Sequence, residues 1–130
     1  MSGWDCLVKK WHGANDAGTS EGARKAALTR GMSLAQHGEF YKSKGLQTFS
    51  HGRNHVGAVN KSETNFTPAQ AHAHLSETGY RKIREHTGLG GLRYHSYEGE
   101  SPGMGWENRA HIAVKGGKIH SIEHAHHFTD

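Results

Sequence analysis

The sequence is poor in cysteine and proline, with one Cys and two Pro among 130 residues. A single Cys cannot form an internal disulfide, which excludes a small domain held together by disulfide bonds. The sequence has no run of about 18 apolar residues, so we expect no transmembrane helix and no insertion into a membrane. The N-terminus lacks a basic segment followed by an apolar one, which predicts synthesis in the cytoplasm and leaves the final location unknown.

The charge is only mildly unbalanced, because 16 basic residues stand against 12 acidic ones and give a net charge of +4. Such an excess favours anionic partners, among them nucleic acid and bacterial wall polymers, without demanding one. A chain of this length, with 33% hydrophobic residues, is typical of one domain with one small core. We therefore predict a single domain over residues 1–130, of unknown oligomeric state.

Histidine is the abundant residue, with 13 copies in the chain. Imidazole changes charge near physiological pH, transfers protons and ligates metals. The composition therefore indicates that some of these side chains carry chemistry, and their positions on the predicted elements decide which chemistry is considered.

Helices are expected in the first two thirds of the chain. Residues 21–43 have helix-forming composition, with two glycines that weaken the pattern. Thr67, Pro68 and Gln70 form a capping box with proline in the first turn, which predicts a helix to about residue 75. A second helical segment is expected over residues 76–87.

Strands are expected in the last third, where apolar and polar residues alternate over residues 92–97, 109–115 and 118–128. Residues 46–60 are ambiguous, and short strands at residues 46–49 and 55–59 are one interpretation of them. Because helices come first and strands last, the sequence predicts an α+β fold, with N-terminal helices and a C-terminal antiparallel sheet or hairpin.

Gly116-Gly117 is a strong signal for a two-residue hairpin turn. With that turn, Val114 pairs with Ile119 and Ile112 pairs with Ser121. Side chains alternate along a strand, so four imidazoles would share one face of the hairpin: those of His111, His120, His124 and His126. Three interpretations remain open, namely a solvated edge, a catalytic histidine and a zinc site, although no HExxH or CxxC spacing is present.

The lone cysteine, Cys6, stands close to the start of a short helix expected over residues 4–12. A thiol at a helix N-terminus has a lowered pKa, because the helix dipole stabilises the thiolate. The alternative is an inert core cysteine packed beside Trp4 and Trp11.

Two short segments together resemble the NlpC/P60 type of papain-like cysteine hydrolases: Asp5-Cys6-Leu7-Val8, and the strand and turn from Ala110 to His120. The resemblance implies that Cys6 is the nucleophile, His111 the general base, and His120 or His124 the orienting group. It also implies cleavage of amide bonds in peptides or peptidoglycan, without a required cofactor, by an antibacterial effector or a phage protein. The chain departs from the family pattern at Leu7-Val8, where Ser-Gly is usual.

A polar cluster at His51, Arg53 and His55 is predicted to bind substrate, for instance a phosphate, and the alternative is a plain surface loop. Tyr97 is added to this predicted substrate-binding set. It shares a strand face with His95, and this pair suits acid–base or ribonuclease chemistry.

Two further function classes therefore stay open beside the cysteine hydrolase. The first is a metal-independent ribonuclease of toxin type, in which His111, His120, His95 and Arg93 supply a base, an acid and a cation. The second is a histidine-rich metal-binding or structural protein without catalysis.

Overall fold

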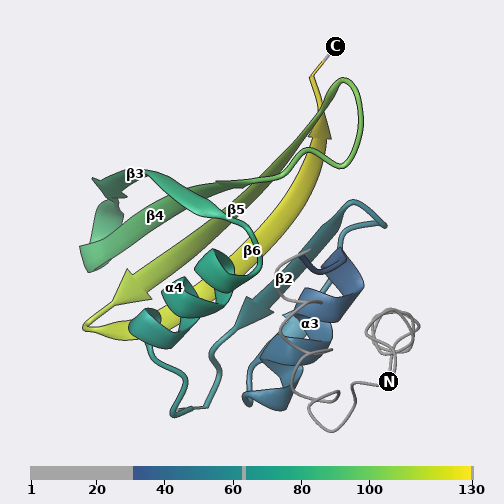
Figure 1. The fold of residues 1–130 in the computed structure, drawn as a ribbon. Helices are drawn as coiled ribbons and strands as arrows, with labels where there is room; N and C mark the ends of the chain where they lie inside the picture. Colours follow the sequence, from purple (N-terminus) through teal and green to yellow (C-terminus); the bar gives the residue numbers. More distant parts are fainter. Residues whose placement is uncertain (1–30, 63, 130) are drawn as a thin grey trace, which may run out of the picture.

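The computed structural model describes residues 31–62 and 64–129, which form one antiparallel sheet with two helices packed against it (Figure 1). The strand order across the sheet is β1-β2-β6-β5-β4-β3. The helices are α3, Leu34–Ser43, and α4, Pro68–Glu77; a 3-10 turn, η1, covers Leu89–Gly91. The strands are β1 Gln47–Phe49, β2 His55–Val59, β3 Arg81–Thr87, β4 Leu92–Gly99, β5 Trp106–Lys115 and β6 Lys118–Phe128.

The core lies between the sheet and the helices. One row across four strands places Val56, His124, Ala110 and Tyr97 side by side, and all four are buried. A second row of Ala58, Ile122 and Ile112 runs parallel to it, so this face of the sheet supplies most of the core. We call it the helix face, and we call the opposite side, which α3 and α4 leave uncovered, the open face.

Both helices begin as their sequences dictate. Ser33 caps α3 with Gln36 as its reciprocal partner, and Thr67 and Gln70 form the same capping box on α4. The predicted start of the second helix is therefore confirmed, with Pro68 in its first turn. No helix among the described residues is long and apolar enough to cross a membrane.

The predicted helical segment over residues 76–87 is wrong, because α4 ends at Glu77 and residues 81–87 form strand β3. Gly79 has a φ of +92°, which breaks the helix, and the chain then pairs with β4. β3 is an edge strand with all seven residues exposed, so it carries no apolar period that the sequence could reveal.

The α+β class is confirmed, but the chain order is less simple than helices followed by strands, because α4 lies between β2 and β3. The ambiguous residues 46–60 contain the short strands β1 and β2, and β1 is the edge strand at the end of the sheet opposite to β3. The expected helix over 21–43 is represented by α3; its first part, residues 21–30, lies outside the described residues, as do Cys6 and residues 4–12.

The hairpin at Gly116-Gly117 is confirmed, and both glycines have positive φ, at +58° and +76°. The expected pair Val114 and Ile119 is also present. Beyond it, a β-bulge inserts His120 as an extra residue, so every following pair is shifted by one. His111 now lies opposite Glu123 on the open face, whereas His124 lies opposite Ala110 on the helix face.

The predicted common face for four histidines is therefore wrong. His126 is two residues from His124 and lies on the helix face with it, while His111 lies on the other side of the sheet. A one-residue shift is enough for this result, because side chains alternate with a period of two.

Candidate functional site

A buried cluster of three histidines and two tyrosines lies between the helices and β6. His37 and Tyr41 come from α3, His74 from α4, and His124 from β6, while Tyr80 follows α4. The rings of His37 and His124 stack at 4.0 Å, and His37 Nδ1 lies 2.9 Å from His74 Nε2. His124 and Tyr41 are fully buried, so solvent and substrates do not reach them.

The hydrogen bonds of this cluster have one consistent direction. Asn108 Nδ2 donates to the carbonyl of Glu100, so Asn108 Oδ1 accepts from the hydroxyl of Tyr80 at 2.9 Å. Tyr80 has then used its only proton and must accept from Nδ1–H of His124 at 3.0 Å. His124 Nε2 is left as an acceptor for the Tyr41 hydroxyl, at 2.5 Å. This series of hydrogen bonds requires the imidazole of His124 to be neutral.

Burial keeps all three imidazoles neutral. Burial, with a smaller effect of His74 and His126, lowers the pKa of His37 to about 3. Burial, with a smaller effect of Lys44, lowers the pKa of His74 to about 4. The pKa of His124 is also well below its usual value, because the side chain is desolvated and surrounded by other histidines. We assign this cluster to the stability of the fold, and His124 cannot orient a catalytic His111 on the opposite face of the sheet.

The direction of the hydrogen bonds can be measured with two variants. Tyr80→Phe removes both a donor and an acceptor, which leaves His124 Nδ1–H and Asn108 Oδ1 unpaired, so we expect a loss of about 2–4 kcal/mol in the free energy of unfolding. Tyr41→Phe leaves one acceptor unpaired, and we expect about 1–2 kcal/mol. Urea unfolding followed by circular dichroism measures both values, and a larger loss for Tyr41→Phe would reverse the assigned direction.

The predicted general base, His111, lies on the open face. Its Nδ1 is 3.0 Å from Ser96 Oγ, and Glu123 lies opposite it on β6. Partial desolvation of the ring lowers the pKa of His111, an effect that Glu123 opposes and Arg84 and Arg109 increase. His120 is exposed at the bulge.

The predicted substrate-binding residues separate into two places. His51 and His55 lie together at the turn between β1 and β2, with the backbone N–H of His51 3.2 Å from His55 Nδ1. His55 also contacts Glu123 at 3.1 Å, and both His55 and Arg53 line a pocket of about 490 Å³ beside α3. Tyr97 does not belong to this group, because it lies on the helix face and contacts α4.

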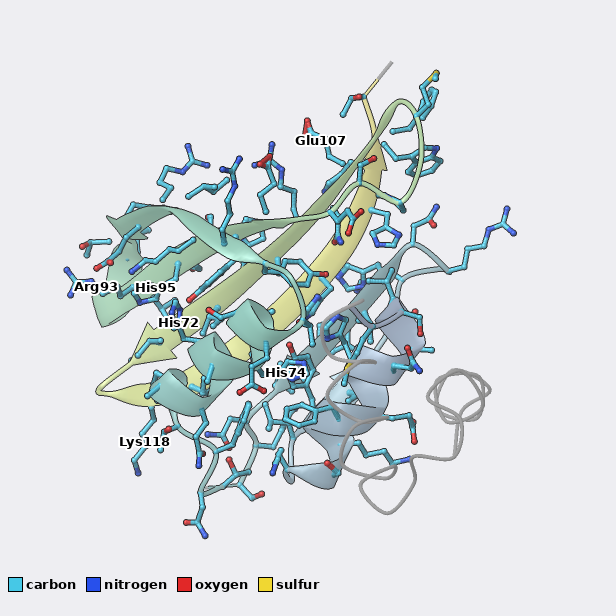
Figure 2. All side chains as sticks on the ribbon, viewed as in Figure 1. His72, His74, Arg93, His95, Glu107 and Lys118 are labelled. Carbon is cyan, nitrogen blue, oxygen red and sulfur yellow. The ribbon has the colours of Figure 1, made fainter. Side chains whose placement is uncertain are left out.

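A second pocket, of about 220 Å³, is lined by histidine, lysine and tyrosine side chains that come from three separate elements. Its apolar half consists of Pro68, Ala69, Ile112 and Val114. Its polar half consists of His72, Lys82, His95 and Tyr97, from α4, β3 and β4. Figure 2 shows His72, His95 and nearby Arg93 on the opposite side of α4 from His74. We call this the His72–His95 pocket.

Two of its side chains contact polar groups on neighbouring strands. His72 Nδ1 lies 2.6 Å from the hydroxyl of Tyr97, whose ring is buried. His95 Nδ1 lies 3.5 Å from Glu85 Oε2. The expectation that His95 and Tyr97 share a face is confirmed, since both lie in helix-face rows of the sheet.

A β-bulge in β3 brings Lys82 to the same face. Lys82 pairs with Tyr97 and Arg84 with Ser96, so Ile83 is the extra residue. Without the bulge, residues three apart would point to opposite faces of the sheet. With it, Lys82 and Glu85 both lie on the helix face, and Lys82 Nζ is 2.6 Å from Glu85 Oε2.

The electrostatics of the pocket favour a neutral His95 next to positive charge. Desolvation lowers the pKa of His95 most, and the charges of Lys82 and Arg93 lower it further against the opposing effect of Glu85. Desolvation also raises the pKa of Tyr97, so its phenol stays protonated. The pocket thus combines a base that is unprotonated at neutral pH with cations that suit an anionic substrate.

The described residues contain no group of three or more His, Cys, Asp or Glu side chains arranged to hold a metal ion. The zinc interpretation is left without a candidate ligand set in that part of the chain. The arrangement that is present, two imidazoles and a Lys in one pocket, suits proton transfer at a phosphate ester.

Sequence reasoning named His95, Arg93 and Tyr97 but missed His72 and Lys82 as members of a site. His72 and His74 are two residues apart on α4 and do not face each other: His72 contacts Tyr97, and His74 contacts His37. Their partners lie on other elements, which the spacing alone does not reveal.

Comparisons with protein families, with curated proteins and with solved structures found nothing that matches this chain.

Proposed function

We propose that the chain is a metal-independent ribonuclease whose reaction takes place in the His72–His95 pocket. The observation that carries the proposal is the convergence of two imidazoles and an ammonium group, from three separate elements, on one pocket of about 220 Å³. Cleavage of RNA by its own 2′-hydroxyl needs a base, an acid and a cation, and needs no metal.

In the proposed reaction, neutral His95 accepts the proton of the 2′-hydroxyl. The 2′-oxygen forms a bond to phosphorus, and the bond from phosphorus to the 5′-oxygen breaks. Protonated His72 gives its proton to the departing 5′-oxygen. The products are a 2′,3′-cyclic phosphate and a 5′-hydroxyl, so atoms and charges balance without a further reactant.

The cations act on the charge that develops during this step. Lys82 lines the pocket, and Arg93 lies close enough to His95 to lower its pKa. Positive groups fixed beside a phosphorane stabilise its additional negative charge more than that of the ground state. Tyr97 holds the His72 ring through Nδ1, and we assign Tyr97 a positioning role.

Cleavage of amide bonds by Cys6 stays a separate prediction, since Cys6 lies outside the described residues. Delivery as an antibacterial effector or as part of a phage is likewise an untested expectation. The ribonuclease is preferred because the groups of the His72–His95 pocket are assembled within the described residues. The sets expected from the sequence are not assembled: His111 and His124 of the hydrolase set lie on opposite faces of the sheet, and so do His111 and His95 of the ribonuclease set.

The proposal is tested by incubating the full chain with a single-stranded RNA oligonucleotide in excess EDTA. We expect cleavage to continue, with products that end in a 2′,3′-cyclic phosphate, identified by mass spectrometry. A DNA oligonucleotide of the same sequence should remain intact, because it lacks the attacking 2′-hydroxyl. Cleavage of the DNA, or inhibition of RNA cleavage by EDTA, would contradict the proposed chemistry, as would intact RNA.

A further inference from the structure

We infer that the carboxylate of Glu85 occupies the position in which the His72–His95 pocket binds the substrate phosphate, and that the substrate must displace it. The inference rests on the proposed function for the identity of the substrate. It makes Glu85 an internal competitor for anions, and so a residue that sets substrate affinity.

Glu85 is bound by the two cations that the mechanism assigns to the phosphate, Lys82 and Arg93, and lies beside the proposed base His95. Its Oε2 lies 2.6 Å from Lys82 Nζ and 3.5 Å from His95 Nδ1, and its Oε1 lies 3.1 Å from Arg93 Nε. Two cations and one imidazole thus converge on one carboxylate. A carboxylate and a phosphate group offer similar oxygen acceptors to such donors, which is why both bind at the same kinds of cationic site.

Glu85 is placed so that its carboxylate can move away from these cations into solvent. It lies on β3, the edge strand, and its side chain is 36% exposed. Lys82 and Arg93 are also partly exposed, at 36% and 59%, so an incoming anion reaches them from solvent. Exposed ion pairs of this kind contribute little to stability, and the contacts of Glu85 are therefore readily exchanged for contacts with a ligand.

The chain offers a matched control at Glu98. This carboxylate accepts from Arg81 at 2.9 Å and lies 3.6 Å from Arg109, so it too contacts two cations. It lies on the open face, in the row of Arg81 and Arg109, away from the pocket. Removing its charge changes the net charge of the protein by the same amount and leaves the His72–His95 pocket intact.

The experiment compares the full chain with Glu85→Gln and Glu98→Gln, using inorganic phosphate as the probe in isothermal titration calorimetry at pH 7 and low salt. Glutamine keeps the size of the side chain and removes its charge. We expect phosphate to bind about 3–10-fold more tightly to Glu85→Gln, since the competing anion is gone, and with unchanged affinity to Glu98→Gln. With RNA, Glu85→Gln should lower KM by a similar factor and leave kcat unchanged.

Two results would overturn the inference: phosphate binding that is unchanged or weaker in Glu85→Gln, or a kcat that falls about 100-fold, which would make Glu85 a catalytic base. Glu85→Thr, which suits a strand, repeats both measurements if the first variant unfolds. If phosphate binds more tightly but RNA is never cleaved, the inference stands as anion competition and the ribonuclease proposal fails. If RNA is cleaved and Glu85→Gln behaves as the wild type, only the inference fails.

Discussion

Unfolding of this protein is expected to become steeply favourable as the pH falls below about 6. The cause is the buried cluster, in which His37, His74 and His124 are neutral in the folded state, with pKa values lowered by burial. In the unfolded chain the same groups titrate near pH 6.5. Protons therefore bind preferentially to the unfolded state.

The direction of the pH dependence of stability follows from these lowered pKa values. Above pH 6.5 both states are neutral and the contribution of the cluster is fully present. It is lost as the pH falls from 6.5 toward the folded pKa values, about 4 for His74 and about 3 for His37. In this window each group lowers the free energy of unfolding by about 1.4 kcal/mol for each pH unit, so three groups together lower it by about 4 kcal/mol for each unit. A domain of ordinary stability would unfold at roughly pH 4–5.

Urea unfolding at several pH values between 5 and 8 measures this dependence. His74→Phe should reduce the slope of the free energy of unfolding against pH by the equivalent of about one proton. The ring of His74 stacks on Phe40 with centroids 3.9 Å apart, and a phenyl ring can keep this stacking without titrating. His86→Ala is the matched control, because His86 is an exposed histidine on β3 and its removal leaves the buried cluster in place. A free energy of unfolding that is constant from pH 8 to pH 5 would contradict the assignment.

Loss of catalysis in His95→Ala is the second large effect that we expect. Removing the base should lower kcat for RNA cleavage by about 10²–10⁴-fold, which is the usual contribution of a positioned proton acceptor. His72→Ala should cause a loss of similar size, because the leaving oxygen then has no acid. The double variant should be little worse than either single variant, since the two groups act in one step.

Two controls separate a catalytic loss from general damage. His111→Ala removes an exposed histidine on the open face and should retain activity, whereas a catalytic strand built on His111 predicts the opposite. Circular dichroism at neutral pH checks that each variant is folded. Full activity in both His95→Ala and His72→Ala would remove the pocket as the active site.

The pH profile of the wild type gives an independent measure of the same base. Because cleavage requires neutral His95, kcat/KM should rise with pH along a limb whose midpoint lies below 6.5, the usual histidine pKa. The limb should disappear in His95→Ala. Measurements above the acid unfolding transition keep the two effects apart.

Features of the fold that depend on neighbouring residues are readable from the sequence. The capping box at Thr67 and Gln70 starts α4, and Gly116-Gly117 turns the last hairpin, because each acts within a few residues of the chain. The α+β class follows from such signals. Strand β3 was not predicted, because a fully exposed edge strand has no apolar pattern in its sequence.

Which histidines and cations share a face of the sheet depends on two single-residue bulges that the sequence does not reveal. The extra residue His120 turns His124 into the core and leaves His111 on the open face. The extra residue Ile83 brings Lys82 onto the face of His95. Each bulge is set by how two strands pair, and one residue reverses every side chain beyond it.

By itself, then, the sequence determined the local elements, the abundance of imidazole and the residue types suited to proton transfer. Only the tertiary structure decided which histidines are buried and neutral and which line a pocket. That division depends on contacts between distant elements, such as His72 with Tyr97 and His37 with His74. Burial is a property of the assembled fold, and it is burial that lowers the pKa values of these imidazoles.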